Sequence, residues 1–132
     1  MWVCLKSPLA IPSIDIPSNR FTLLLNDELL SYHQDPLKKQ GRLIRRDIYS
    51  TGTRDVWGAP LSNNRYLLVF INAMVKDADF EINLRTEAKL GPVGAYALRD
   101  PIARRTLGSS SNEVLTVRGV VRQGVAARVV SL

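Results

Sequence analysis

The sequence has one cysteine and one histidine among its 132 residues. Cys4 therefore has no second cysteine in this chain with which to form a disulfide. A protein zinc site normally takes three or four Cys, His or carboxylate ligands, and the usual Cys and His sets cannot be built from Cys4 and His33 alone. We expect no disulfide framework, no metal and no cofactor.

Long hydrophobic runs and aromatic residues are also scarce. The longest unbroken apolar run, residues 66–71, is far too short to span a bilayer, and the first residues lack the pattern of a signal peptide. The net charge is +6, but the basic residues are spread from Lys6 to Arg128, and aromatic residues make up 7% of the chain. Nucleic-acid interfaces combine clustered cations with stacking aromatics. We therefore expect a solvated basic surface, with no nucleic-acid or membrane partner.

The first part of the chain differs in pattern from the rest. Residues 1–11 are mostly apolar and favour a buried strand, which is followed by a segment with two prolines and then a short helix. Asn26 or Asp27 can cap a second helix over residues 28–33. The Asp-Pro pair at 35–36 ends that helix.

From Leu37 onward, short apolar runs alternate with turn residues. Residues 66–71 are apolar on both sides, as in a central strand, whereas residues 79–85 alternate and have one solvated face. Residues 108–112 are expected to form a turn. Together these runs predict a mainly β fold, an antiparallel β-sandwich of Greek-key-like topology over residues 37–132. The expected strands are residues 42–48, 54–57, 66–72, 79–85, 93–99, 113–118 and 125–130.

Three acidic residues form the first candidate site. Asp77, Asp79 and Glu81 are two apart and would share one face of a strand or hairpin. Such a trio can bind a cation or a sugar, or it can be the solvated side of an amphipathic strand. We favour the solvated side, because no binding loop adjoins the three residues.

The other candidate residues have structural interpretations as well. His33 precedes Asp35 and could belong to a catalytic relay, but a histidine at a helix C-terminus commonly caps or packs, and the chain has no Gly-x-Ser-x-Gly elbow. Cys4 is interpreted as an inert buried thiol. Residues 91–94 lack the features of a phosphate loop, and residues 109–111 are taken as a flexible turn. We predict no catalytic, cofactor-binding or metal-binding residue.

Several motifs resemble the glycoside hydrolases of family 27, the α-galactosidases (melibiases) and α-N-acetylgalactosaminidases. Residues 30–41, Leu-Ser-Tyr-His-Gln-Asp-Pro-Leu-Lys-Lys-Gln-Gly, are similar to the family stretch Asn-Gln-Asp-Pro-Leu-Gly-Lys-Gln-Gly. Residues 55–62 resemble the Val-Trp-x-x-Pro-Leu-Ser segment that opens the family's C-terminal domain. Residues 123–132 resemble its closing strand. The resemblance implies that residues 1–36 are the last strand and helix of a truncated (β/α)8 barrel and that residues 37–132 are the C-terminal β-domain.

The resemblance also implies an activity, hydrolysis of terminal α-D-galactosides with retention. Retaining enzymes use two carboxylates about 5 Å apart. The family's two catalytic aspartates lie on earlier barrel strands, and no residue here matches either motif. We therefore expect this chain to be inactive alone, to pack on its own barrel, and to meet an α-galactoside only through that barrel. The family implies a secreted or lysosomal origin, but localisation is not predicted.

One alternative comes from a different class of protein. A stand-alone carbohydrate-binding or protein-interaction module could stack sugars on exposed aromatic rings. Trp57, Tyr66 and Tyr96 are the rings available for that purpose.

Overall fold

The computed structural model describes residues 26–132, and the described part begins at a helix cap. Helix α3 spans Asp27–His33, and the Asn26 side chain accepts hydrogen bonds from the backbone N–H groups of Glu28 and Leu29 at 3.0 and 3.2 Å. Asn26 is one of the two caps that the sequence predicts, and its side chain satisfies N–H groups that have no partner within the helix. The strand expected over residues 1–11 and the helix after it lie outside the described residues.

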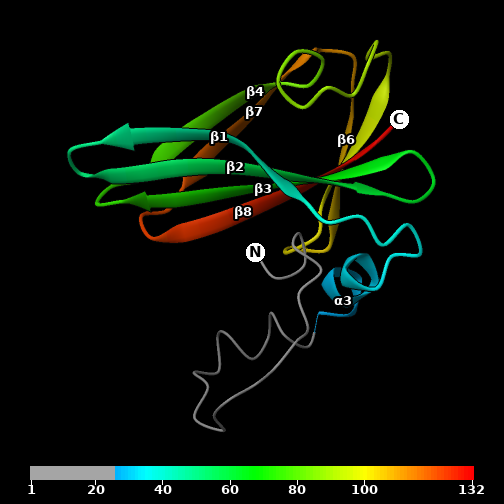
Figure 1. Ribbon diagram of the computed structural model, residues 1–132, viewed down its shortest axis with the longest axis horizontal. Coiled ribbons are helices and arrows are strands. Elements are labelled where there is room, and N and C mark those ends of the chain that lie inside the picture. The colour runs from blue at the N-terminus through cyan, green and yellow to red at the C-terminus, as the bar shows by residue number, and fades with distance from the viewer. Residues whose placement is uncertain (1–25) are drawn as a thin grey trace, which may run out of the picture.

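Eight strands follow the helix and form two antiparallel layers (Figure 1). A six-stranded sheet has the order β1-β2-β3-β8-β5-β6, and a two-stranded sheet pairs β4 with β7. The chain leaves the large sheet for β4, returns to it for β5 and β6, leaves it again for β7 and returns at β8, which lies beside β3. The strands are β1 Arg42–Tyr49, β2 Gly52–Leu61, β3 Arg65–Met74, β4 Ala78–Asn83, β5 Tyr96–Asp100, β6 Arg105–Ser110, β7 Val114–Val120 and β8 Gly124–Ser131.

Strand β3 is buried on both faces, as its continuous apolar run predicts. Alternate side chains point to opposite sides of a sheet, so Leu68 and Phe70 pack toward β4 and β7, whereas Leu67 and Val69 pack on the side of α3. Phe70 meets Phe80 of β4 edge to face, with ring centroids 5.5 Å apart. Figure 1 shows α3 and the β4–β7 pair on opposite sides of the six-stranded sheet. The predicted mainly β, antiparallel sandwich is confirmed.

One strand was not predicted. Residues 108–112 were expected to form a turn, but Arg105–Ser110 forms β6, which pairs with β5 from Tyr96↔Ser110 to Asp100↔Arg105. All but the last residue of β6 are exposed, so its sequence has no alternation of buried and solvated residues. Gly108 has φ of 102° next to an irregularity in the β5 register, a conformation that glycine adopts readily. Strand β6 therefore depends on pairing with β5 rather than on its own pattern.

A buried amide fastens the returning chain to the end of β3. Asn72 is 0% exposed, and its Nδ2 donates to the carbonyl oxygens of Lys76, Val120 and Val121 at 3.0, 2.9 and 3.3 Å. Its Oδ1 accepts from the Met74 N–H at 3.0 Å. One side chain therefore links the β3–β4 turn to the segment between β7 and β8.

Replacing this amide tests whether it holds the two layers together. We expect Asn72→Ala to lower the free energy of unfolding by about 1–3 kcal/mol, because buried backbone groups lose their partners. Urea unfolding followed by tryptophan fluorescence measures the change. Asn112→Ala is the matched control, since Asn112 is exposed and contributes only its backbone to the contacts with Ser110 and Tyr96. Equal stability of the two variants would contradict this role of Asn72.

Candidate functional site

The acidic trio lies beside the β7–β8 segment and supports its backbone. Asp77 Oδ1 accepts from the Arg122 N–H at 3.0 Å, and Asp79 Oδ1 accepts from the Gly119 N–H at 2.7 Å. Glu81 is exposed on β4. Within residues 26–132, no group of three or more His, Cys, Asp or Glu side chains is placed to hold a metal ion.

The other candidates have local roles or fall outside the described residues. His33 lies in the last turn of α3, where a basic residue complements the helix dipole. Ser109 and Ser110 belong to β6 rather than to a flexible turn. Cys4 lies outside the described residues. No helix of residues 26–132 is long and apolar enough to cross a membrane.

Two polar clusters attach α3 to the large sheet, and the first is centred on Glu28. The guanidinium of Arg99, on β5, donates from Nε to Glu28 Oε1 at 2.6 Å and from Nη2 to Oε2 at 2.8 Å. The Tyr32 hydroxyl also donates to Oε1, at 2.7 Å. A bidentate arginine–carboxylate pair fixes both position and direction, so the first turn of α3 is oriented over β5.

The Glu28 cluster shifts two pKa values. Burial alone would raise the pKa of Glu28, but the hydrogen bonds from Arg99 and Tyr32 and the charge of Arg99 outweigh it and hold that pKa below the usual 4.5. Burial and the neighbouring Glu28 carboxylate raise the pKa of Tyr32 to about 12. Both groups therefore keep their ordinary ionisation state near neutral pH, with Glu28 charged and Tyr32 neutral.

The second cluster is centred on Asp35, just after α3. Asp35 is 2% exposed, and its Oδ1 accepts from the Leu37 N–H at 3.0 Å and the Ser62 N–H at 2.9 Å. Its Oδ2 accepts from the Ser62 hydroxyl at 2.8 Å and lies 3.5 Å from Arg65 Nη2. The end of the helix is therefore bound to the turn between β2 and β3. These contacts cross the predicted boundary after Pro36, so α3 packs with the β-domain.

Apolar side chains fill the space between the two polar clusters. Leu29 and Tyr32 of α3 are 7% and 5% exposed and pack on the face of the large sheet that points away from β4 and β7. Asn26 adds a contact at the helix start, donating from Nδ2 to the Pro101 carbonyl at 2.9 Å. Helix α3 thus covers one face of the sheet and spans from the β5–β6 turn to the β2–β3 turn. Its partners on that face are Ala59, Leu61, Leu67, Val69, Ala127 and Val129, with Trp57, Ile71 and Ile102 at the border.

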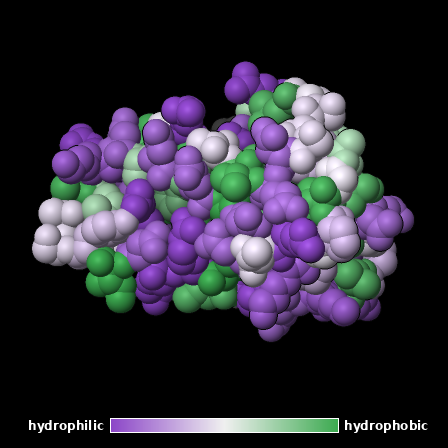
Figure 2. Space-filling view, turned by 90° about the horizontal axis from the view of Figure 1, so that it is seen from above, coloured by the Kyte–Doolittle hydropathy of each residue, from purple (hydrophilic) through white to green (hydrophobic). Residues whose placement is uncertain are grey.

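The three aromatic rings proposed for sugar stacking do not form an exposed surface. Tyr66 and Tyr96 are 8% and 2% exposed, and both belong to the core between the layers. Trp57 is partly buried on the opposite face, against the α3 cluster. In the view of Figure 2 the surface is mainly hydrophilic, and its hydrophobic side chains lie in separate patches.

Sequence reasoning missed the partners in both polar clusters. Glu28 and Arg99 are 71 positions apart, and no periodicity or local motif relates them. Asp35 and Ser62 do lie in the two motifs most similar to family 27, but only the fold shows that these motifs meet.

The Glu28 cluster predicts a pH-dependent stability. A carboxyl with a lowered folded pKa stabilises the fold above its unfolded pKa, and this contribution disappears as the pH falls through the folded value. We expect Glu28→Gln to lower the free energy of unfolding by about 1–2 kcal/mol near neutral pH, with a smaller deficit near pH 3.5. Urea unfolding at both pH values measures it. The control is Glu81→Gln, the same change on exposed β4; a deficit independent of pH would contradict the assignment.

Known proteins are similar to this chain in sequence. Residues 51–127 match the family described as the alpha galactosidase C-terminal beta sandwich domain. The chain is 32% identical over 84 residues to a probable alpha-galactosidase of Dictyostelium discoideum, an alignment that covers 62% of this chain and 21% of the relative. It is 35% identical over 75 residues to an alpha-galactosidase of Oryza sativa, covering 54% of this chain and 17% of the relative. The chain thus spans about a fifth of the length of these curated relatives.

Solved structures share the fold at lower identity. Alpha-galactosidase I from Mortierella vinacea superposes with a TM-score of 0.82 at 20% identity, over 98% of this chain and 33% of that one. The alpha-galactosidase of Saccharomyces cerevisiae with raffinose gives a TM-score of 0.85 at 14% identity, over 98% of this chain and 41% of that one. The family match covers more than half of this sequence and coincides with the two-layer sandwich. The chain therefore belongs to the α-galactosidase C-terminal β-sandwich family.

Proposed function

We propose that this chain is the structural C-terminal unit of an α-galactosidase-like glycoside hydrolase, and that it does not cleave glycosides by itself. On this proposal, residues 1–36 come from the end of a (β/α)8 barrel and residues 37–132 pack against that barrel. Substrate, a terminal α-D-galactoside, is bound by the barrel alone. The observation that carries the proposal is the docking of α3 on the large sheet through Glu28 and Asp35.

This docking supports a role in assembly because it joins the two parts of the chain by complementary contacts. The helix resembles the end of the barrel, and the sheet belongs to the C-terminal family. Two charged clusters and an apolar patch hold the helix on one face of that sheet. Partly buried ionic contacts of this kind favour one fixed orientation over others. A C-terminal domain that supports a barrel needs such a fixed orientation.

The carboxylates of the described residues are poor candidates for retaining catalysis. The reaction needs a free carboxylate nucleophile beside a carboxylic acid whose pKa is raised. Glu28 has the opposite shift, and Asp35 is enclosed by donors. The hydrogen bonds and charge of Arg46 outweigh burial and hold the pKa of Asp55 below its usual value. Asp100 contacts Arg128 and two backbone N–H groups.

Hydrolysis of a chromogenic α-galactoside by the purified 132-residue chain tests this proposal. We expect turnover no higher than that of buffer and of heat-denatured chain, while Mortierella vinacea alpha-galactosidase I in the same assay gives a clear rate. Turnover that copurifies with the chain and is lost on denaturation would overturn it.

A sugar titration separates the proposal from a stand-alone carbohydrate-binding module. We expect no change in tryptophan fluorescence when galactose or melibiose is added at millimolar concentration, because the Trp57 ring packs against the α3 cluster. Native and urea-unfolded chain provide the reference spectra. A saturable change would contradict the structural role and favour a binding module.

A further inference from the structure

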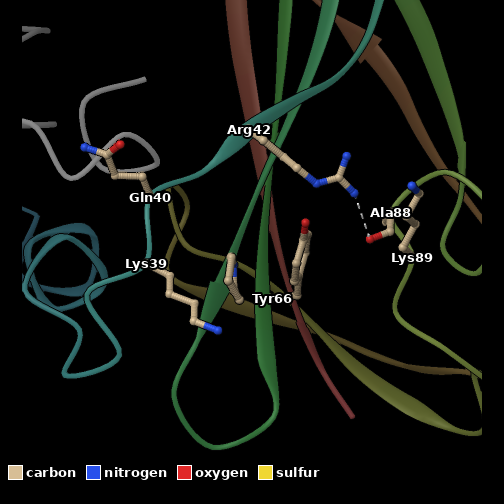
Figure 3. Close-up of a pocket in the computed structure, with 7 residues that line it drawn as sticks. Lys39, Gln40, Arg42, Tyr66, Ala88 and Lys89 are labelled. Carbon is tan, nitrogen blue, oxygen red and sulfur yellow. Dashed lines mark hydrogen bonds between the residues drawn. The ribbon is translucent and has the colours of Figure 1, made fainter.

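A groove lies near the β2–β3 turn, on the side of the large sheet that faces β4 and β7. It has a volume of about 670 Å³ and is open to solvent. Three separate parts of the chain meet there: the segment that leads into β1, the ends of β2 and β3, and the loop between β4 and β5 (Figure 3). Its lining residues are Lys39, Gln40, Arg42, Pro60, Tyr66, Ala88 and Lys89.

The charge of this lining is entirely positive. Lys39, Arg42 and Lys89 are all exposed, and no acidic side chain of residues 26–132 lines the groove. Glu87 is adjacent in sequence, but its carboxylate accepts from Arg45 Nη1 and from the Asn83 N–H, both at 2.7 Å. The excess positive charge of the groove is therefore not neutralised by that carboxylate.

Arg42 is held across the groove with part of its donor capacity unused. Its Nη2 lies 3.4 and 3.5 Å from the carbonyl oxygens of Ala88 and Glu87, which bridges β1 to the β4–β5 loop. A guanidinium has five N–H donors in a planar fork, and these contacts use only one nitrogen. Figure 3 shows Arg42 reaching toward Ala88, with the Tyr66 hydroxyl directed to the same region.

The floor of the groove is rigid because Tyr66 is tightly packed beneath it. Gly58 of β2 makes room for this ring: a Cβ atom at Gly58 would come within 2.6 Å of Tyr66 Cε1 and 2.7 Å of Ile44 Cδ1. Tyr66 is 8% exposed, so only a small part of it reaches the groove. The cations are thus arranged around a fixed, mainly apolar floor formed with Pro60 and Ala88.

We propose that this groove binds a doubly charged oxyanion, a phosphate or sulfate group, through Arg42, Lys89 and Lys39. A guanidinium pairs with two oxygens of such an anion, and the ammonium groups add charge from the two sides. Neither the activity of the family nor the structural role proposed above depends on this site.

Titration of the isotopically labelled full chain with inorganic phosphate, and separately with sulfate, tests the site at about 0.15 M salt, where interactions between distant surface charges are screened. We expect saturable amide shifts in NMR spectra at Arg42, Tyr66 and Lys89. Arg42→Gln weakens binding by about ten-fold through the loss of one charged hydrogen-bonding partner. Lys89→Gln, in the exposed β4–β5 loop, tests whether the opposite wall of the groove contributes to anion binding. A response to one of the two anions alone identifies which group the site prefers.

The matched control is Arg105→Gln, which removes the same charge from exposed strand β6 on the far edge of the sheet from β1. It should bind as tightly as the unmodified chain, and neutral galactose should give no shift at the groove. Equal weakening by Arg105→Gln, shifts spread over all basic residues, or the same response to galactose would overturn the proposal. A native-like amide spectrum of each variant before titration shows that it is folded.

Discussion

The buried carboxyl of Asp35 is the contact on which the arrangement of helix and sheet depends. A carboxylate that is 2% exposed has lost most of its water, so protein donors must replace it. Ser62 supplies a backbone N–H and a hydroxyl, and Arg65 supplies the charge. All of these donors lie at the β2–β3 turn, so the helix can end in only one place on the sheet. Loss of this contact would leave a buried carboxyl without partners and an apolar sheet face without its cover.

Strand β3 is apolar on both sides because another element covers each of its faces. A strand in the interior of a sandwich needs cover on each face, and two unlike elements provide it here. The β4–β7 pair covers one face with Phe80 and Ile82, and α3 covers part of the other with Leu29 and Tyr32. Asn72 at the end of β3 then fastens the connection that brings the chain back to β8. The large sheet is thus held from both sides by contacts between residues far apart in sequence.

Five carboxylates of the described residues are already bound by donors within the fold, and this bears on the proposed function. Glu28, Asp35 and Asp55 each bind an arginine, and Asp77 and Asp79 bind backbone N–H groups. The arginine contacts help hold the pKa values of Glu28 and Asp55 below their usual range, which is opposite to the raised pKa that an acid catalyst requires. These contacts support the proposed structural role, whereas Lys39, Arg42 and Lys89 line the groove. The candidate anion site lies at the same end of the sandwich as the Asp35 contacts, but on the face of the large sheet opposite to α3.

The sequence by itself determined most of the strands, the cap at Asn26 and the central position of β3, because each depends on a pattern within a few residues. It could not predict β6, whose exposed residues have no such pattern and form a strand only by pairing with β5. It also could not join Glu28 to Arg99, or bring Lys39, Arg42 and Lys89 to one groove. The local periodicity of a sequence indicates which side of a helix or strand is buried. Which distant charges meet is decided only when the packed layers fix their positions.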